Sequence, residues 1–453
     1  MTERLAEFAL GLDAGKTTPQ RRNLLRKAIL DTVVSAIAGT ATVNARQSAA
    51  ASAGLFGKGN AAVWGTDTSQ SVAGAIFANC AAASALDVDD GHRGASGHAG
   101  AAIVPAALTY GSEIGVSGTD VLNAILAGYE VALRVGAARR RHDNMSFASG
   151  RWAGYGVAAA LGRLAGLSRS QLAHAIAIAG TEAPMNLPQG DYATVSSVKG
   201  SSPWSSITAF GAMLRAREGA TGPIDILDRP HAFDKNILSS NLGECFEFDQ
   251  IYFKPYASCR YTHPAVDAIL DIRENPTFDP TKIEHVEVRI FPEARKISNE
   301  ISPKTLEGAQ FSTPFVSALA LLYGAPSLRP MTEKSLSNSA VLRLAASIDL
   351  VFADEFRGVF PGKTPATVKV SADGQEFSST IIDPLGDPAN SMDVDHLSRK
   401  AEDLLRRTFA ASRIHAIVDE INDLDAGGVD DLASLLAAAP DQVNTPNPER
   451  LAI

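Results

Sequence analysis

The chain has 453 residues, of which 45% are hydrophobic and 20% charged, and its formal charge is -9. A globular chain of this length can form two or three domains. Its net negative charge gives no sign of a nucleic-acid-binding surface. Three cysteines form no CxxC pair, which excludes a cysteine-built zinc site and fits a reducing compartment. Because we find neither a signal-peptide pattern nor an apolar run of about 18 residues, we expect a cytoplasmic protein that does not enter a membrane.

Most of the first half of the chain carries the apolar spacing of helices. We expect helices at 20–40, 72–86, 101–115, 119–139, 152–166 and 171–183. Ser168 stands in an N-cap position, and Ser202 followed by Pro203 predicts the start of another helix. Frequent Ala and Gly residues allow close approach, and short breaks favour antiparallel neighbours, so the pattern predicts a compact helical bundle.

The pattern changes near residue 250. Residues 283–291 alternate like a strand with Val286, Val288 and Ile290 on one face, and Asp373-Gly374 is typical of a hairpin turn. We expect interleaved helices at 263–273, 313–323 and 335–346, and helical structure again from 394 to 438.

The simplest arrangement is a multidomain α and α+β protein. It has a large all-helical domain made from residues 1–258 and 388–453, and a smaller α+β lid domain, residues 259–387, inserted into it. The cleft between the two domains is the expected place for a small ligand.

Residues 85–108, ALDVDDGHRGASGHAGAAIVPAAL, place several ionisable groups between two apolar runs. One interpretation is a metal site, but the related diphosphate-binding motif of terpenoid synthases needs a carboxylate where this chain has Arg93. A second is a purely structural loop in which aspartates cap helices. A third is an acid–base site: His98 precedes a helix, and Asp87 or Asp90 holds its imidazole in one tautomer.

The same segment resembles the signature of the MmgE/PrpD family, and three further segments extend the likeness over most of the chain. They are LLRKAILDTVVSAIAGT (24–40), VKGSSPWSSITAFGAMLRAREGATGP (198–223) and YFKPYASCRYTHPAVDAI (252–269). The family includes 2-methylcitrate dehydratases, cis-aconitate decarboxylases and iminodisuccinate epimerase. The resemblance implies a helical domain with an inserted lid, a homodimer, and no metal or organic cofactor.

The resemblance also implies a set of catalytic residues. His98 and Lys199 are the expected acid–base pair, and Asp87 is expected to orient His98. Cys259 is a possible proton carrier, although a buried thiol is as common a reading of a lone cysteine. Lys199 would need a pKa lowered by its surroundings to act as a base, and otherwise would bind an anion or lie on the surface.

A second set of residues is expected to bind the carboxylates of the substrate. Arg260 is the candidate for a bidentate clamp, and the others are Lys254, His92, Tyr256, His263 and Arg151. For His263 the structural alternative is a role at the start of a helix, and for Arg151 it is a surface salt bridge.

The chain departs from decarboxylase-type members, which carry Thr, His and Tyr where this chain has Gly91, Cys259 and Phe315. We therefore expect proton abstraction and return next to a carboxylate of a small dicarboxylate, first as an isomerase: an epimerase of iminodisuccinate. A 2-methylcitrate dehydratase, which is a lyase acting on a tricarboxylate, is the alternative. A non-catalytic helical scaffold is the further alternative.

Overall fold

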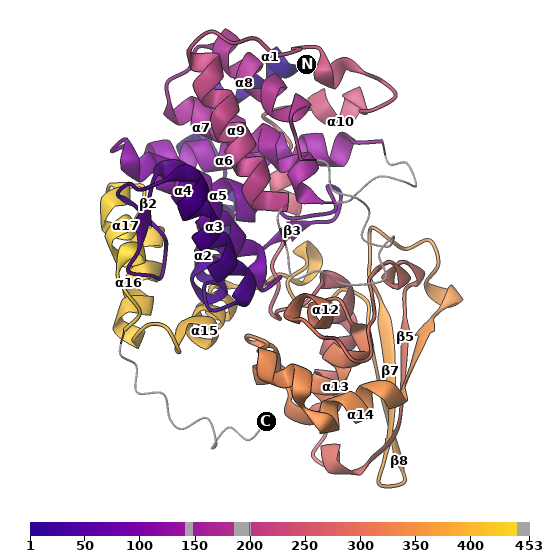
Figure 1. The fold of residues 1–453 in the computed structure, drawn as a ribbon. Helices are drawn as coiled ribbons and strands as arrows, with labels where there is room; N and C mark the ends of the chain where they lie inside the picture. The colour runs from indigo at the N-terminus through magenta and orange to yellow at the C-terminus, as the bar shows by residue number, and fades with distance from the viewer. Residues whose placement is uncertain (141–147, 185–198, 200, 442–453) are drawn as a thin grey trace.

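The computed structural model describes residues 1–140, 148–184, 199 and 201–441. The chain forms two parts (Figure 1). Both ends build a helical part, and the middle of the chain builds an α+β part around one larger sheet. The predicted two-part architecture is therefore confirmed.

The helical part contains the following long helices before residue 250: α1 (Thr2–Gly11), α2 (Pro19–Gly39), α3 (Val43–Phe56), α4 (Val72–Ala85), α5 (Gly100–Glu113), α6 (Gly118–Ala138), α7 (Ala153–Leu164), α8 (Arg169–Thr181) and α9 (Ser201–Arg217). The short α10 (Lys235–Ser239) follows. Ser168 caps α8 with a complete capping box, as predicted. The expected start at Ser202 is wrong: α9 begins at Ser201, and Pro203 still lies in its first turn, where a missing N–H costs nothing.

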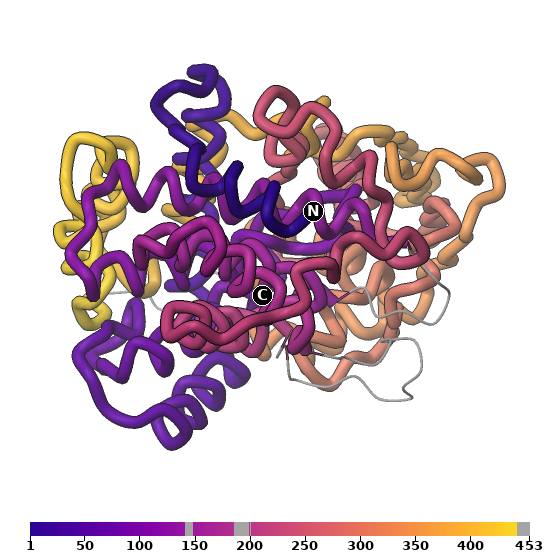
Figure 2. Tube along the Cα trace, turned by 90° about the horizontal axis from the view of Figure 1, so that it is seen from above, coloured from indigo at the N-terminus to yellow at the C-terminus, as the bar shows by residue number. Residues whose placement is uncertain are grey.

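Small residues let the central helices pack so closely that their backbones are in contact. A Cβ added to Gly156 on α7 would lie 2.1 Å from the carbonyl oxygen of Gly128 on α6. By length and apolar composition α6 could cross a membrane, yet 94% of its most apolar window is buried inside the protein. α6 packs along α7 in this helical part, which Figure 2 shows from above.

The helical part is not all-helical, which corrects the sequence-based expectation. It carries two short antiparallel ladders, β1 (Ala61–Ala62) with β2 (Ser69–Gln70), and β3 (Gly91–His92) with β4 (Ile251–Tyr252). The second ladder joins segments about 160 residues apart in the sequence (Gly91 pairs with Tyr252). Two-residue strands carry too little periodicity to be seen in a sequence.

The α+β part is a four-stranded sheet in the order β6–β5–β7–β8. Its strands are β5 (Ile283–Ile290), β6 (Ile348–Phe352), β7 (Ala366–Ala372) and β8 (Gln375–Ile381), and its helices are α11 (His263–Arg273), α12 (Leu306–Gln310), α13 (Thr313–Tyr323) and α14 (Ser339–Ser347). β5 and β6 are parallel, and helices α12–α14 provide the crossover that such a pair requires. The hairpin turn at Asp373-Gly374 and the buried face of β5 are as predicted, whereas α14 begins four residues later than expected, after an Asn338 cap.

Residues 394–441, as far as the structure describes the end of the chain, form three helices: α15 (Val394–Leu405), α16 (Ala411–Asn422) and α17 (Val429–Ala437). α15 packs against α2, far away in the sequence. Lys400 on α15 is 4% exposed and pairs with the buried Asp31 on α2, and it also donates to the carbonyl of Val88 at 2.6 Å. One side chain thus ties the end of the chain to residues 85–108. The division at residues 259 and 387, and the action of the α+β part as a lid, remain predictions.

We predict that Gly156→Ala lowers the free energy of unfolding by about 1–3 kcal/mol, because the added methyl would overlap the Gly128 carbonyl. Gly211→Ala is the control: it lies inside α9 with open space around it, so we expect a gain of about 0.5–1 kcal/mol. Urea unfolding of both variants checks this, and a similar change in both would contradict the close helix contact.

We predict that Lys400→Met lowers the free energy of unfolding by about 3–5 kcal/mol, because Asp31 would remain buried without a counter-charge. The double variant Asp31→Asn with Lys400→Met should recover part of that loss. As a control, Lys282→Met removes an exposed pair with Asp373 and should leave the free energy of unfolding nearly unchanged. Equal losses in the two lysine variants would show that burial of the Lys400 pair has no energetic role.

Candidate active site

The motif loop, residues 86–99, connects α4 to α5 and folds back on itself. Asp87 adopts a left-handed conformation (φ 53°) directly after the end of α4, which short polar side chains tolerate better than most. His92 and Gly97 then form a bridge, with backbone hydrogen bonds in both directions. His98 follows, two residues before α5 begins, as predicted.

Four other segments meet this loop. Lys254, two residues after β4, lies beside the motif loop because β4 pairs with β3. Lys199, two residues before α9, contacts the loop as well. Gln310, the last residue of α12, donates to the carbonyl of Ala85 at 3.1 Å. Lys400 on α15 holds the carbonyl of Val88. Both parts of the fold therefore contribute to one site.

Four charged side chains and one imidazole form a row at this junction, which we call the charged row: Lys199, Asp87, Lys254, Asp89 and His98. Asp87 lies between two ammonium groups, 3.2 Å from Nζ of Lys199 and 3.3 Å from Nζ of Lys254. Asp89 lies 3.9 Å from Nζ of Lys254 and 3.4 Å from Nδ1 of His98. The row brings together the predicted pair His98 and Lys199 through shared carboxylates.

The hydrogen bond of His98 determines its tautomer. Its Nδ1 lies 2.6 Å from the carbonyl oxygen of Asp90, and a carbonyl can only accept, so Nδ1 carries the proton. In the neutral ring Nε2 then holds a lone pair, and Nε2 makes no hydrogen bond within the described residues. The side chain is 26% exposed, so this nitrogen is accessible as a proton acceptor. The structure places Asp89, and not the predicted Asp87, beside the imidazole.

Lys199 is held on three sides. Besides Asp87, its ammonium donates to Oε1 of Gln310 at 2.7 Å and to the carbonyl of Ser84 at 3.3 Å. Its side chain is 15% exposed. The ammonium is thus held in one orientation while its side chain stays partly accessible to solvent. This arrangement suits proton donation or binding of a carboxylate.

The aspartates of the loop differ in charge state. Burial alone would raise the pKa of Asp87, but Lys199 and Lys254 hold that pKa well below its ordinary value, so this carboxylate stays ionised. Burial, and next the nearby carboxylates of Asp31 and Asp89, raise the pKa of Asp90 well above its ordinary value. Asp90 therefore favours its neutral form, whereas the other aspartates of this region pair with lysines: Asp31 with Lys400, Asp87 with Lys199 and Lys254, and Asp89 with Lys254. Within the described residues no three His, Cys, Asp or Glu side chains are arranged to hold a metal ion.

Arg260 is engaged elsewhere. Its guanidinium donates to Asp387 at 2.6 Å and to the carbonyls of Pro384 and Leu385, and the residue is 4% exposed. Arg93 contacts the other carboxylate oxygen of Asp387. Asp387 thus joins the motif loop to the segment after β4. This geometry favours a structural role over the predicted carboxylate clamp.

Two other predicted binding residues also face protein groups. The hydroxyl of Tyr256 donates to Asp267 at 2.8 Å. His263 opens α11, as the structural alternative proposed, and its Nε2 donates to the carbonyl of Ser258. Burial, and next Arg260, lower the pKa of His263 well below its ordinary value, so the ring stays neutral.

Cys259 lies near the charged row, close to Asp87 and Lys254. Cys259 is partly exposed, but burial of its thiol and the nearby Asp87 raise its pKa to about 12. The thiol therefore stays protonated near neutral pH and is a poor base. Arg151 is half-buried in the turn before α7.

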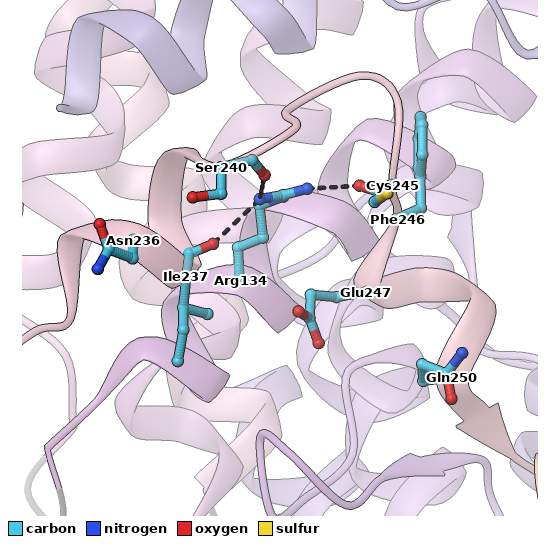
Figure 3. A pocket seen from close by; sticks show the side chains of 8 residues that line it. All are labelled: Arg134, Asn236, Ile237, Ser240, Cys245, Phe246, Glu247 and Gln250. Atoms are coloured by element: carbon cyan, nitrogen blue, oxygen red, sulfur yellow. Dashed lines mark hydrogen bonds between the residues drawn. The ribbon is translucent and has the colours of Figure 1, made fainter.

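His92 lies behind the loop, away from the charged row. Its Nδ1 accepts from the backbone N–H of Ala95, and Nε2 lies 3.4 Å from Glu247. Burial lowers its pKa to about 4. Glu247 belongs to a separate pocket of about 300 Å³ (Figure 3), whose Arg134 already donates to three backbone carbonyls. The pocket contains none of the predicted site residues.

Sequence reasoning missed Gln310 and Lys400 and gave Asp89 no role. Gln310 ends a five-residue helix, and Lys400 lies on a strongly amphipathic helix where a lysine is usually exposed. The sequence signal for Lys400 is its position on the apolar face of that helix, between Leu397 and Leu404.

Comparison with known proteins agrees with this architecture. Residues 3–243 match the MmgE/PrpD N-terminal domain, and residues 256–424 match the MmgE/PrpD C-terminal domain. The chain is 24% identical over 445 residues to the cis-aconitate decarboxylase-like protein oryM of Aspergillus oryzae, covering 90% of this chain and 91% of that protein. It is also 24% identical over 395 residues to the cis-aconitate decarboxylase of Aspergillus terreus, covering 78% of each chain.

The two matched regions cover most of the chain, and the charged row is assembled from the segments that carry the family likeness. The protein belongs to the MmgE/PrpD family.

Proposed function

We propose that the protein is an enzyme that moves a proton at a carbon next to a carboxylate of a small polycarboxylate, without an organic cofactor. The observation that carries this proposal is that His98, whose Nδ1 is held by the carbonyl of Asp90 so that Nε2 is left without a partner among the described residues, and the Lys199 ammonium lie at the two ends of one row of paired side chains. A carbanion formed next to a carboxylate needs a base on the proton and a cation near the carboxylate oxygens. His98 and Lys199 supply these two groups.

Within this chemistry, the first candidate is a lyase reaction on an unsaturated or hydroxylated tricarboxylate. The two similar proteins are described as a cis-aconitate decarboxylase and a protein like one, which supports loss of CO2 from cis-aconitate. In that reaction the carbanion left by the loss of CO2 takes up a proton at a carbon next to a remaining carboxylate, and Lys199 is the oriented donor. Dehydration of 2-methylcitrate is a variant, in which the proton from the acid leaves with the hydroxyl as water.

Epimerisation of iminodisuccinate is the second candidate. It requires only two proton carriers on opposite faces of one carbon, and His98 and Lys199 are two such groups from different segments. The high pKa of Cys259 argues against this thiol as the second base. A homodimer in the cytoplasm remains our expectation for the assembly and location.

One experiment distinguishes the reactions. The protein in D2O is given cis-aconitate, 2-methylcitrate and chiral iminodisuccinate separately, and proton NMR follows each. Decarboxylation gives a five-carbon unsaturated dicarboxylate, dehydration gives a new alkene, and epimerisation exchanges the α-proton with loss of optical rotation. No change in any of the three substrates would overturn the proposed function and favour a non-catalytic scaffold.

We predict that His98→Gln and Lys199→Met each lower kcat/KM by about 10²–10⁴-fold, because each removes one proton-transfer group. Circular dichroism should show unchanged helical content.

Two variants serve as matched controls for these substitutions. His174→Gln removes another imidazole bound to backbone groups, and Lys27→Met removes another half-buried lysine that donates to a carbonyl. Both should keep kcat/KM within about threefold. Full activity in His98→Gln and Lys199→Met would show that the assigned residues are wrong.

A further inference from the structure

The side chain of Tyr252 lies across Gly91 in the motif loop. The two residues pair in the β3–β4 ladder. A Cβ added to Gly91 would lie 2.4 Å from the hydroxyl oxygen of Tyr252 and 2.5 Å from its Cζ. The tyrosine hydroxyl therefore occupies the space that a side chain at position 91 would take, four residues after Asp87.

The ring of Tyr252 is fixed by its neighbours. The residue is 6% exposed, and the guanidinium carbon of Arg260 lies 5.1 Å from the ring centroid. The charged and titratable groups around it are Arg260, Cys259, Arg93 and Asp87. Because Asp87 belongs to the charged row, Tyr252 lies at the border of this row.

The hydroxyl of Tyr252 makes no hydrogen bond with the part of the chain that the structure describes, whereas the hydroxyl of the nearby Tyr256 donates to Asp267. A tyrosine whose ring is largely buried usually has a hydrogen-bond partner for its hydroxyl. A hydroxyl that is positioned but unpaired at the edge of an acid–base site is available to a bound molecule.

We propose that Tyr252 is a further catalytic residue, whose hydroxyl donates a hydrogen bond to the substrate carboxylate on which negative charge develops. This inference rests on the proposed function, because it assumes that the charged row handles a carboxylate substrate. No proton is transferred in this role: the O–H donates, and the carboxylate oxygen accepts more strongly as charge builds up on it.

The chemical state of Tyr252 suits this role. Burial raises the pKa of its phenol well above the ordinary value, which keeps the hydroxyl protonated throughout the neutral range. Because the ring is packed between Gly91 and Arg260, the donor is held in place before the substrate binds, and little reorganisation is needed.

The first test is Tyr252→Phe, which keeps the ring and removes only the hydroxyl. We expect kcat to fall on the order of 10²-fold with KM little changed, because the interaction strengthens only in the transition state. The thermal midpoint should not fall. The control is Tyr110→Phe, a buried tyrosine on α5 that packs against Phe210 outside the charged row, and it should keep full activity.

The outcomes separate the two proposals. An active wild type together with a Tyr252→Phe variant that keeps more than half of its kcat would overturn the role of Tyr252 alone. A wild type that converts none of the three polycarboxylates would overturn the proposed function, and the role of Tyr252 with it.

A second variant covers the case in which Tyr252→Phe does not fold. Incorporation of 3,5-difluorotyrosine at position 252 keeps the ring and the hydroxyl but makes the phenol more acidic. The alkaline limb of the kcat/KM profile should then move to lower pH, because the donor loses its proton earlier. An unchanged alkaline limb would overturn the proposal.

Discussion

The structure depends on the mutual compensation of buried charges around the motif loop. An isolated ammonium or carboxylate in a protein interior is very costly, so Lys254, which is fully buried, is stable only beside Asp87 and Asp89. Lys400 on α15 and Asp31 on α2, both buried, compensate each other in the same way. The helices, the β3–β4 ladder and the end of α12 are arranged so that these opposite charges meet.

The need to compensate buried charge also explains why two aspartates of the loop differ in charge state. Asp87 is ionised because two lysines flank it, while Asp90 is neutral because it is buried near other carboxylates. The neutral residue still contributes through its backbone, since its carbonyl fixes the Nδ1 proton of His98. The surrounding helices carry Ala and Gly at their contacts, which leaves little room for movement of the backbone that positions these groups.

Local patterns predicted most of the fold, and long-range contacts account for most of what they missed. The helices α11 and α13 have the expected bounds, because a proline in the first turn marks each start. In the site, His98, Lys199, Asp87 and Lys254 lie together as the resemblance implied, because each belongs to a recognisable segment. The partner of Arg260 could not be identified from its residue type, since Asp387 lies 127 residues away. The pair of Lys400 and Asp31 spans 369 residues and leaves no periodic signal at all.

The distant origin of Lys400 has a consequence for how the protein is made. A chain emerging from the ribosome presents Asp31, Asp87 and Asp89 early, with only Lys199 from the same N-terminal region to balance them. Lys254 arrives later, and Lys400 arrives last of all. The motif loop can therefore reach its final conformation only when synthesis is nearly complete and the last helices have joined. For the same reason, exchanging one matched region between relatives would separate charges that pair in the folded protein.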